Sequence, residues 1–398
     1  MNFIFISPNF PHTYWLFCDR LCRNGVNVLG IGDAPYDILE EPLKKSLIEY
    51  YKVDSLENYS DVYNAVKFFT EKYGKIDWIE SNNEYWLEQD AKLRSDFDIQ
   101  TGINIDEINN WKHKSIMNKI YREAGIPVAK QHYITDLNSA KIFINEIGGY
   151  PVIVKPDVGV GAAHTWKLHN DKELERFFNE KPNVPYVMEE FIVGNVCSYD
   201  SIVDSKSMPL FESMTVWPPS IADIVNNGLD LSYYTTTEMS DKLRVLGRKA
   251  IQAFKVKSRF VHLEFFCLTE PHKGIGEVSD FAALEVNMRP AGGYTPDMMN
   301  FAHSTDVYQI WADMITYDSR KLDDSGKHKF CVYASRKNLH KYCHSHEDIL
   351  RRYKKQIVMC EQMPELMWET MGNQMYTACF SNQNDVQEFI KFVHDKES

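Results

Sequence analysis

Apolar and polar positions alternate between two periods in the first hundred residues of the chain. Short apolar runs of strand length are separated by segments with apolar side chains at helical spacing. Strands that alternate with helices in this way predict a parallel sheet covered by helices. We therefore expect an α/β domain at residues 1–105. The expected strands are Phe3–Ser7, Val26–Ile31, Ile48–Val53 and Ile76–Glu80, with helices near 14–23 and 59–73.

Two later strands, 261–266 and 284–289, carry polar side chains at every second position. The period of a strand puts Glu285, Asn287 and Arg289 on one face, between apolar neighbours on the other. Three polar groups on one face would be costly in a purely structural sheet. This face is therefore predicted to be functional.

The connection between these two strands is rich in turn-forming residues, which favours a hairpin. If the strands pair, Glu264 and Glu285 lie roughly 5 Å apart on one face. Carboxylate and amide oxygens favour Mg²⁺ or Mn²⁺ over zinc, and an arginine beside them suits a phosphate. His262 is expected to be a hydrogen-bonded neighbour of this group rather than a ligand.

The region from 106 to 318 carries further candidate chemistry. A helix at 115–124 ends at Gly125-Ile126-Pro127, and a strand at 152–156 ends in Lys155-Pro156. The loop after this strand contains Gly159 and Gly161 among small residues, which predicts a mobile segment whose N–H groups bind phosphates. A third strand is expected at 186–192.

Composition sets outer limits on the function. The 398 residues are enough for two or three domains, and the net charge of −12 argues against nucleic acid or an anionic membrane as partner. No apolar run approaches the ~18 residues of a membrane span. Residues 1–7 resemble a strand more than a signal peptide, and the eight cysteines have no framework spacing. A cytoplasmic protein with reduced thiols is expected.

Two common nucleotide-binding motifs are absent from the sequence. The first β–α turn lacks G-x-G-x-x-G, and no G-x-x-x-x-G-K-[ST] occurs.

At the other end, residues 319–398 are expected to form a small α+β domain that helps to close the substrate side. Its strands are predicted near 330–334 and 375–380, and a final helix at 385–394.

Taken together, the motifs resemble those of the ATP-grasp superfamily. The resemblance is to the carboxylate–amine (amino-acid) ligase group, which is similar to biotin carboxylase and the carbamoyl-phosphate synthase large chain. It covers roughly the first 320 residues. The fold that it implies has a parallel pre-ATP-grasp domain at 1–105 and an ATP-grasp domain of two α+β subdomains at 106–318. The α+β segment 319–398 follows.

The resemblance also implies roles for individual residues. One departure is His113, which stands where the family usually has aspartate before its first lysine. The implied nucleotide-binding residues are Lys114, Lys155, Gly159, Gly161, Glu189, Glu190 and Ile192. The implied metal ligands are Glu264, Glu285 and Asn287, and the implied catalytic residues are Arg289, Gly292 and Gly293.

The activity implied by the resemblance is ligation of a small-molecule carboxylate to an amine. ATP and Mg²⁺ (or Mn²⁺) would serve an acyl-phosphate intermediate, with release of ADP and phosphate. The resemblance favours a homodimer without settling the oligomeric state. Two alternatives stay open, a bicarbonate-activating enzyme and a non-catalytic ATP-binding regulatory protein. The general base for the amine is also open among Asp200, Glu212 and Asp297.

Overall fold

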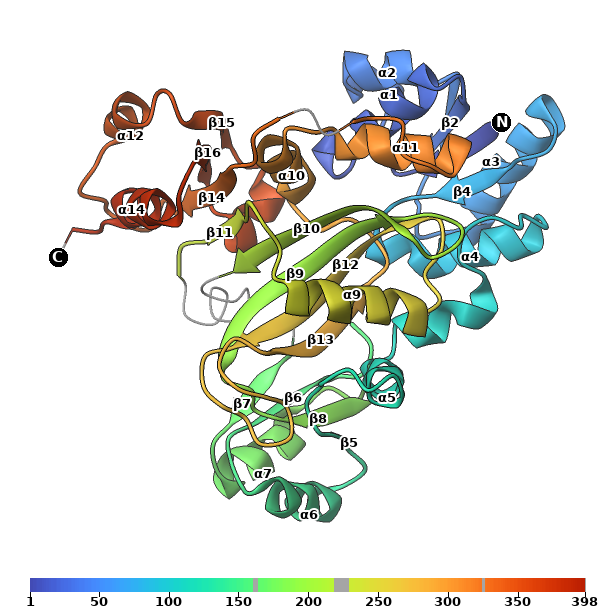
Figure 1. Cartoon of the computed structure of the whole chain (residues 1–398). Helices are drawn as coiled ribbons and strands as arrows, with labels where there is room; N and C mark the ends of the chain where they lie inside the picture. The colour runs from blue at the N-terminus through green and yellow to red at the C-terminus, as the bar shows by residue number, and fades with distance from the viewer. Residues whose placement is uncertain (160–163, 218–228, 324–325, 398) are drawn as a thin grey trace.

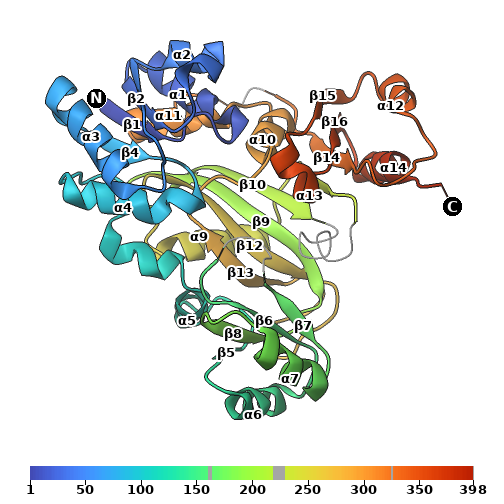
Figure 2. The same ribbon diagram turned by 180° about the vertical axis from the view of Figure 1, so that it is seen from behind.

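The computed structural model describes residues 1–159, 164–217, 229–323 and 326–397. Within these ranges the strands form three sheets. Figures 1 and 2 show the first sheet in the N-terminal part of the chain and the second at the far end of the molecule. The largest sheet lies between them and continues toward the C-terminus.

The N-terminal sheet is parallel and has the strand order β3-β2-β1-β4. Alternate residues of β1 face opposite sides: Phe3 and Phe5 pack toward α1, while Ile4 and Ile6 pack toward α3. Burial on both faces explains why β1 is apolar from Phe3 to Ile6. The elements are β1 (Asn2–Ile6), α1 (Trp15–Arg23), β2 (Asn27–Gly32), α2 (Glu41–Ser46), β3 (Glu49–Lys52), α3 (Tyr59–Tyr73), β4 (Trp78–Glu80) and α4 (Leu87–Asp96).

The second sheet is antiparallel and has the order β5-β8-β6-β7. One of its faces is covered by α6 and α7 through a shared apolar cluster that includes Phe143, Val154, Phe177 and Met188. Helix α5 (Lys114–Glu123) connects this sheet to the largest one. The other elements are β5 (Gln131–Tyr133), α6 (Leu137–Ile147), β6 (Val152–Pro156), β7 (Trp166–Leu168), α7 (Asp171–Glu180) and β8 (Tyr186–Glu190).

The largest sheet is antiparallel, with the order β13-β12-β9-β10-β11-β14-β16-β15. Helix α9 (Asp241–Ala253) covers one face, and at Gly247 it lies so close to β9 that an added Cβ would be 2.4 Å from the Tyr199 ring. The strands are β9 (Gly194–Val203), β10 (Pro209–Trp217), β11 (Ser232–Thr235), β12 (Arg259–Leu268), β13 (Phe281–Asn287), β14 (Phe330–Arg336), β15 (Ile357–Gln362) and β16 (Gln374–Phe380).

The C-terminal strands extend this sheet rather than forming one of their own. The predicted strands and final helix are confirmed as β14, β16 and α14 (Gln383–His394). However, β14 pairs with β11, where Ser232 is opposite Ala334. The pairing gives β11 a neighbour on both sides, so its backbone groups are not left at an open edge. Any domain boundary near residue 318 therefore crosses a continuous sheet.

The remaining helices are short, and none in the described ranges is long and apolar enough to cross a bilayer. They are η1 (His12–Tyr14), η2 (Tyr36–Ile38), η3 (Glu84–Trp86), η4 (Ile105–Trp111), α10 (Thr295–His303), α11 (Val307–Tyr317), α12 (His346–Arg352), η5 (Glu365–Met367) and α13 (Trp368–Met371).

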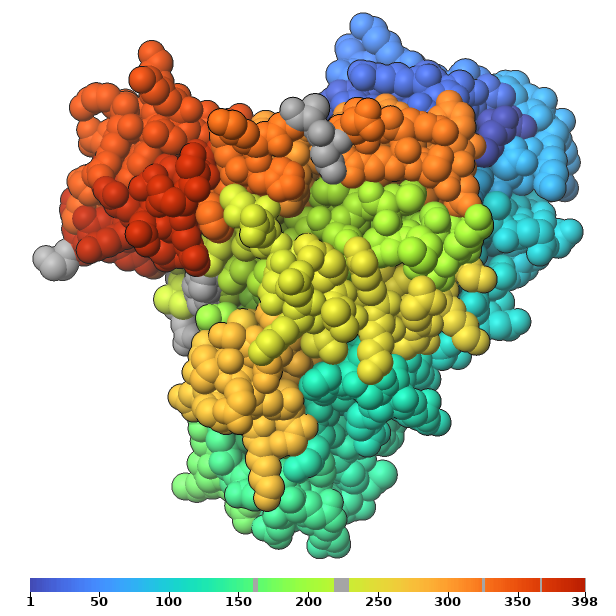
Figure 3. Space-filling model, viewed as in Figure 1, coloured from blue at the N-terminus to red at the C-terminus, as the bar shows by residue number. Residues whose placement is uncertain are grey.

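Helix α11 fixes the N-terminal domain to the largest sheet. Trp311 of α11 packs on Phe17 of α1, and the same apolar cluster contains Phe211 and Phe260 of the sheet. Arg20 adds an ion pair to Asp306, with 2.8 Å between Nε and Oδ2. In the space-filling view of Figure 3, the orange α11 lies directly against the blue N-terminal segments. Residues about 290 positions apart in sequence thus position the two regions relative to each other.

Candidate active site

The predicted hairpin of β12 and β13 is confirmed, and it brings the proposed metal ligands together. Glu264 is directly opposite Glu285, and His262 is opposite Asn287. Directly opposite residues of an antiparallel pair have their side chains on the same face. Two carboxylates and an amide therefore share one face of the largest sheet.

Lys114 begins helix α5, and its side chain reaches this face. Its Nζ lies 2.9 Å from Glu285 Oε1 and donates a hydrogen bond of 2.9 Å to the Gly159 carbonyl oxygen. The side chain is almost fully buried. Of the two loop glycines implied as nucleotide contacts, Gly159 is therefore beside Lys114, whereas Gly161 lies outside the described residues.

Lys155 extends from strand β6 toward the same region. Its Nζ is 2.8 Å from Glu189 Oε2, and the other oxygen of Glu189 accepts a hydrogen bond from Gln131. Burial alone would lower the pKa of Lys155, but the charges of Glu189, Glu285 and Glu264 raise it. The ammonium group consequently stays charged in a nearly buried position, which suits a group that binds phosphate.

Asp157 explains how α5 is held at the end of β6, and the sequence did not identify it. Its Oδ1 accepts a hydrogen bond from the Ser115 N–H at 2.8 Å, and its carbonyl oxygen accepts one from the Lys114 N–H at 2.9 Å. Its Oδ2 lies 2.8 Å from Nδ1 of His113. His113 thus contacts an aspartate from another segment of the chain.

The nucleotide-binding residues implied at the end of β8 are already engaged in part by other groups of the protein. The Glu190 carboxylate accepts a hydrogen bond from the Lys130 N–H at 2.7 Å, and the Glu190 N–H donates to the Lys130 carbonyl. Ile192 is buried just beyond the strand. The side chain of Glu189 faces Lys155. Because the carboxylate and the N–H group of Glu190 are both engaged with Lys130, a contact of Glu190 with a nucleotide would have to use its carbonyl oxygen.

Arg289 follows β13 and leads into the glycine pair. Its guanidinium donates to the Pro290 carbonyl at 2.8 Å and to Asn287 Oδ1 at 3.4 Å. A Cβ at Gly292 would meet nothing within 4 Å, so there is open space beside this residue. Gly293 has φ +62°, and a Cβ there would lie 2.7 Å from the Met371 side chain. The loop therefore depends on glycine at position 293.

Glu84, from helix η3 of the N-terminal domain, also faces Arg289, with 3.9 Å between Oε2 and Nε. Its Oε2 is buried and has no hydrogen-bond partner among the described residues. Burial raises the pKa of Glu84, and the charge of Arg289 partly offsets this. No pattern along the chain singles out Glu84, because its partner Arg289 lies about 200 residues away.

The three candidate bases occupy different environments. Asp200 is fully buried and accepts hydrogen bonds from Ser198 and His262, and Glu212 is paired with Arg248 on the opposite face, beneath α9. Asp297, in the first turn of α10, accepts from the Tyr308 hydroxyl at 3.0 Å. Burial raises the pKa of Asp297 to about 7. A pKa near 7 suits proton transfer at neutral pH.

The donor set fits a hard divalent cation. In the described part of the chain, no three His, Cys, Asp or Glu side chains gather as a self-sufficient metal site. The face instead offers Glu264, Glu285 and the Asn287 amide, beside two lysines. Mg²⁺ typically takes one or two protein carboxylates and completes its shell with water and substrate phosphates. The arrangement suits a cation that arrives with a phosphorylated ligand.

Comparisons with known proteins identify the fold. Residues 113–259 match the ATP-grasp domain family. The L-amino acid ligase of Bacillus licheniformis has a similar structure, with a TM-score of 0.71 at 13% identity over 99% of this chain and 97% of that one. The N5-carboxyaminoimidazole synthetase of Staphylococcus aureus gives 0.72 at 14%, over 99% and 97%.

A biotin carboxylase from Campylobacter jejuni is similar as well, with a TM-score of 0.68 at 15% identity, over 98% of this chain and 90% of that one. At such identities the likeness concerns the fold. Nearly the whole length of each chain is covered, so the N-terminal domain and the C-terminal strands are part of the shared architecture. The chain therefore has the ATP-grasp fold, and its residues 113–259 form an ATP-grasp domain.

Proposed function

We propose that this protein is an ATP-dependent carboxylate–amine ligase that forms an amide through an acyl phosphate. The observation that carries the proposal is the shared face of β12 and β13. Glu264, Glu285 and Asn287 lie together there. Lys114 joins them, with 2.9 Å between its Nζ and Glu285 Oε1. A protein that only bound ATP would have no need of Arg289 beside this set.

Each group of site residues has its own proposed role in phosphoryl transfer. Lys114 and Lys155 would bind the phosphates of ATP, and Glu264, Glu285 and Asn287 would hold Mg²⁺ or Mn²⁺. When bound, the cation supplies positive charge that neutralises phosphate oxygens. The Glu190 and Ile192 backbone would contact adenine. This assignment of the individual residues is supported by their convergence on one region of the structure.

The chemistry begins with attack of the substrate carboxylate on the γ-phosphorus, which gives an acyl phosphate and ADP. Arg289 would stabilise charge on the transferred group, and the N–H groups of Gly292 and Gly293 would face the developing oxyanion. An amine then displaces phosphate. Asp297 is the candidate to receive the proton of the amine, since its pKa of about 7 lies near the working pH.

The substrate side would be formed where the N-terminal domain meets the largest sheet. Glu84 of η3 and Arg289 face each other across this junction, and open space lies beside Gly292. Glu84 Oε2 is buried without a hydrogen bond from the described residues, which is costly, so a donor on the substrate would be favourable there. Small-molecule carboxylates and amines are therefore proposed as the substrates. A homodimer is proposed on the family resemblance alone, and a cytoplasmic location on the eight cysteines without a framework spacing.

The proposal is tested by the products of ATP turnover. Small carboxylic acids, amino acids first, are screened for release of ADP, with hydroxylamine as a universal amine. The expected result is ADP with phosphate, together with a hydroxamate that reports the trapped acyl phosphate. AMP with pyrophosphate would contradict the proposal, because the cation ligands and Arg289 surround the γ-phosphoryl position.

The same screen separates the alternatives. Bicarbonate as the only acid that stimulates ADP release would favour a bicarbonate-activating enzyme. ATP binding without stimulation by any acid would favour a regulatory ATP-binding protein. Arg248→Ala is the matched control for the site variant Arg289→Ala, since Arg248 pairs with Glu212 on the opposite face of the sheet.

A further inference from the structure

Six polar side chains form two rows across β9, β12 and β13. One row is Ser198, Glu264 and Glu285, and the other is Asp200, His262 and Asn287. The proposed function uses Glu264, Glu285 and Asn287 and leaves the other three without a role.

These three residues form a chain of hydrogen bonds that ends on Glu264. The Ser198 hydroxyl donates to Asp200 Oδ2, and Asp200 Oδ1 lies 2.6 Å from His262 Nδ1. Nε2 on the far side of the imidazole lies 3.2 Å from Glu264 Oε1. Because one ring nitrogen is held by Asp200, the other is aimed at Glu264.

The chain is expensive to bury. Asp200 and Ser198 are 0% exposed. Trp217 packs against the His262 ring in an edge-to-face contact, with 5.4 Å between the ring centroids. Replacing a buried ion pair by apolar side chains is often neutral or stabilising, so such a pair is weak evidence for a role in stability alone. The direction of the chain toward one carboxylate oxygen indicates a positioning role.

We propose that Asp200 and His262 are positioning residues for Glu264. Asp200 fixes the His262 ring, and the Nε2–H group of the ring donates to Glu264 Oε1. This contact sets the orientation of the carboxylate and leaves its second oxygen for a divalent cation. The inference rests on the proposed function in one respect, that Glu264 is a ligand of the cation bound with ATP.

Two substitutions of His262 separate positioning from packing. His262→Gln puts an amide N–H near the place of Nε2 and keeps a donor for Glu264. His262→Asn puts its amide near the place of Nδ1, so it keeps a contact with Asp200 and loses the one with Glu264. Mn²⁺ binding with a non-hydrolysable ATP analogue is measured for both by electron paramagnetic resonance, without turnover.

His262→Asn should weaken Mn²⁺ binding about 10- to 100-fold, as loss of a hydrogen bond to a metal ligand typically does. His262→Gln should stay much closer to the wild type. Metal-free binding of the nucleotide should change little in either variant. Equal Mn²⁺ affinity in the two variants, at the wild-type value or below it, would overturn the inference, as would the reverse order.

If His262→Asn fails to fold, Asp200→Ala replaces it, because loss of the carboxylate frees the ring and should weaken Mn²⁺ binding with little effect on the nucleotide alone. Unchanged Mn²⁺ affinity in Asp200→Ala would likewise overturn the inference. Glu212→Gln is the matched control. Glu212 lies on β10, which pairs with the β9 strand of Asp200, but its carboxylate is on the opposite face of the sheet. A wild type that binds no Mn²⁺ with the nucleotide would instead remove the proposed function.

Discussion

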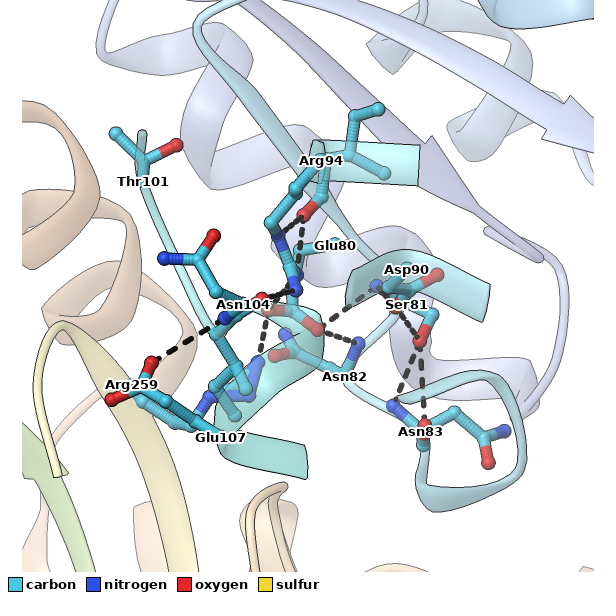
Figure 4. A network of polar contacts seen from close by, with 12 residues as sticks. Glu80, Ser81, Asn82, Asn83, Asp90, Arg94, Thr101, Asn104, Glu107 and Arg259 are labelled. Carbon is cyan, nitrogen blue, oxygen red and sulfur yellow. Dashed lines mark hydrogen bonds and ion pairs between the residues drawn. The ribbon is translucent and has the colours of Figure 1, made fainter. Parts of the chain in front are cut away.

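Two clusters of buried charges lie along the same strand, β12, and they differ in how their carboxylates are satisfied. At the start of the strand, Arg259 binds Glu80 at the end of β4, and Arg94 binds the same carboxylate at 2.9 Å. The N–H groups of Ser81 and Asn82 donate to its other oxygen at 3.1 Å. Figure 4 shows this network at the junction of the N-terminal domain with the largest sheet.

Five residues further along β12, Glu264 belongs to a cluster that is more open to solvent. The side chains of Glu264 and Arg289 are 28% and 22% exposed, whereas those of Glu80 and Arg94 are 5% and 0% exposed. The lysines of the site are held by single carboxylates. A fully enclosed cluster holds two domains together, whereas a partly open cluster leaves room for a charged ligand to form ion pairs with its side chains.

The largest effect should come from Glu285→Gln in the open cluster. The variant keeps the shape of the side chain but removes one charge opposite the bound cation. ADP formation that depends on Mg²⁺ should fall by at least about 10³-fold, because a catalytic cation contributes several kcal/mol. Asn287→Ala should act in the same direction. Wild-type ADP formation in Glu285→Gln would remove this strand from the active site, and Glu277→Gln on the exposed connection is the control.

In the enclosed cluster, Arg259→Met should act on stability. Removing the guanidinium leaves Glu80 with one arginine fewer, and breaking a buried ion pair typically costs about 3–5 kcal/mol. Urea denaturation should show this loss in the free energy of unfolding, and adding Glu80→Gln should restore part of it. The Mg²⁺ concentration for half-maximal turnover should not change. A large change in this concentration would show that the enclosed cluster also contributes to binding of the cation.

Arg289→Ala should lower ADP formation by at least about 10²-fold, the usual cost of removing a donor that faces transition-state charge. Because the side chain is partly exposed, the free energy of unfolding should change less than in Arg259→Met. Steady-state kinetics with the identified carboxylate and urea denaturation together test this. A variant that loses stability but keeps its turnover would show that Arg289 belongs with the structural arginines.

The smallest effect concerns Asp90, which lies in the enclosed cluster and binds Ser81. Burial raises its pKa to about 7, and the charge of Glu80 adds to this. Its pKa in an unfolded chain is about 3.9. Between these values the folded protein keeps a proton that the unfolded chain releases.

Asp90 should therefore lower the free energy of unfolding as the pH rises through this window, by up to about 1.4 kcal/mol per pH unit. Asp90→Asn removes the effect, so the stability of the variant relative to the wild type should increase from about pH 5 to about pH 8. Urea denaturation at both values measures it. A difference that is independent of pH would show that Asp90 is ionised throughout.

Much of the architecture followed from local patterns. The strand near Phe3, the helix at Tyr59–Tyr73 and the strand at Val152–Pro156 were predictable because each buries side chains at its own period. The pairing of Glu264 with Glu285 was predictable for a similar reason, since a turn-rich connection joins two strands of matching alternation. Lys155 stands out as a lysine at the end of an apolar strand, whereas Lys114 could be named only through the resemblance to a family.

By itself the sequence determined which residues form strands and helices and which polar side chains share a strand face, because these depend on neighbours a few positions away. Only the tertiary structure decided that Glu84 faces Arg289, that Asp157 holds α5, that β14 continues the largest sheet, and that His262 connects Asp200 to Glu264. Each of these contacts joins separate elements and depends on how the sheets pack, for which no local period in the sequence exists.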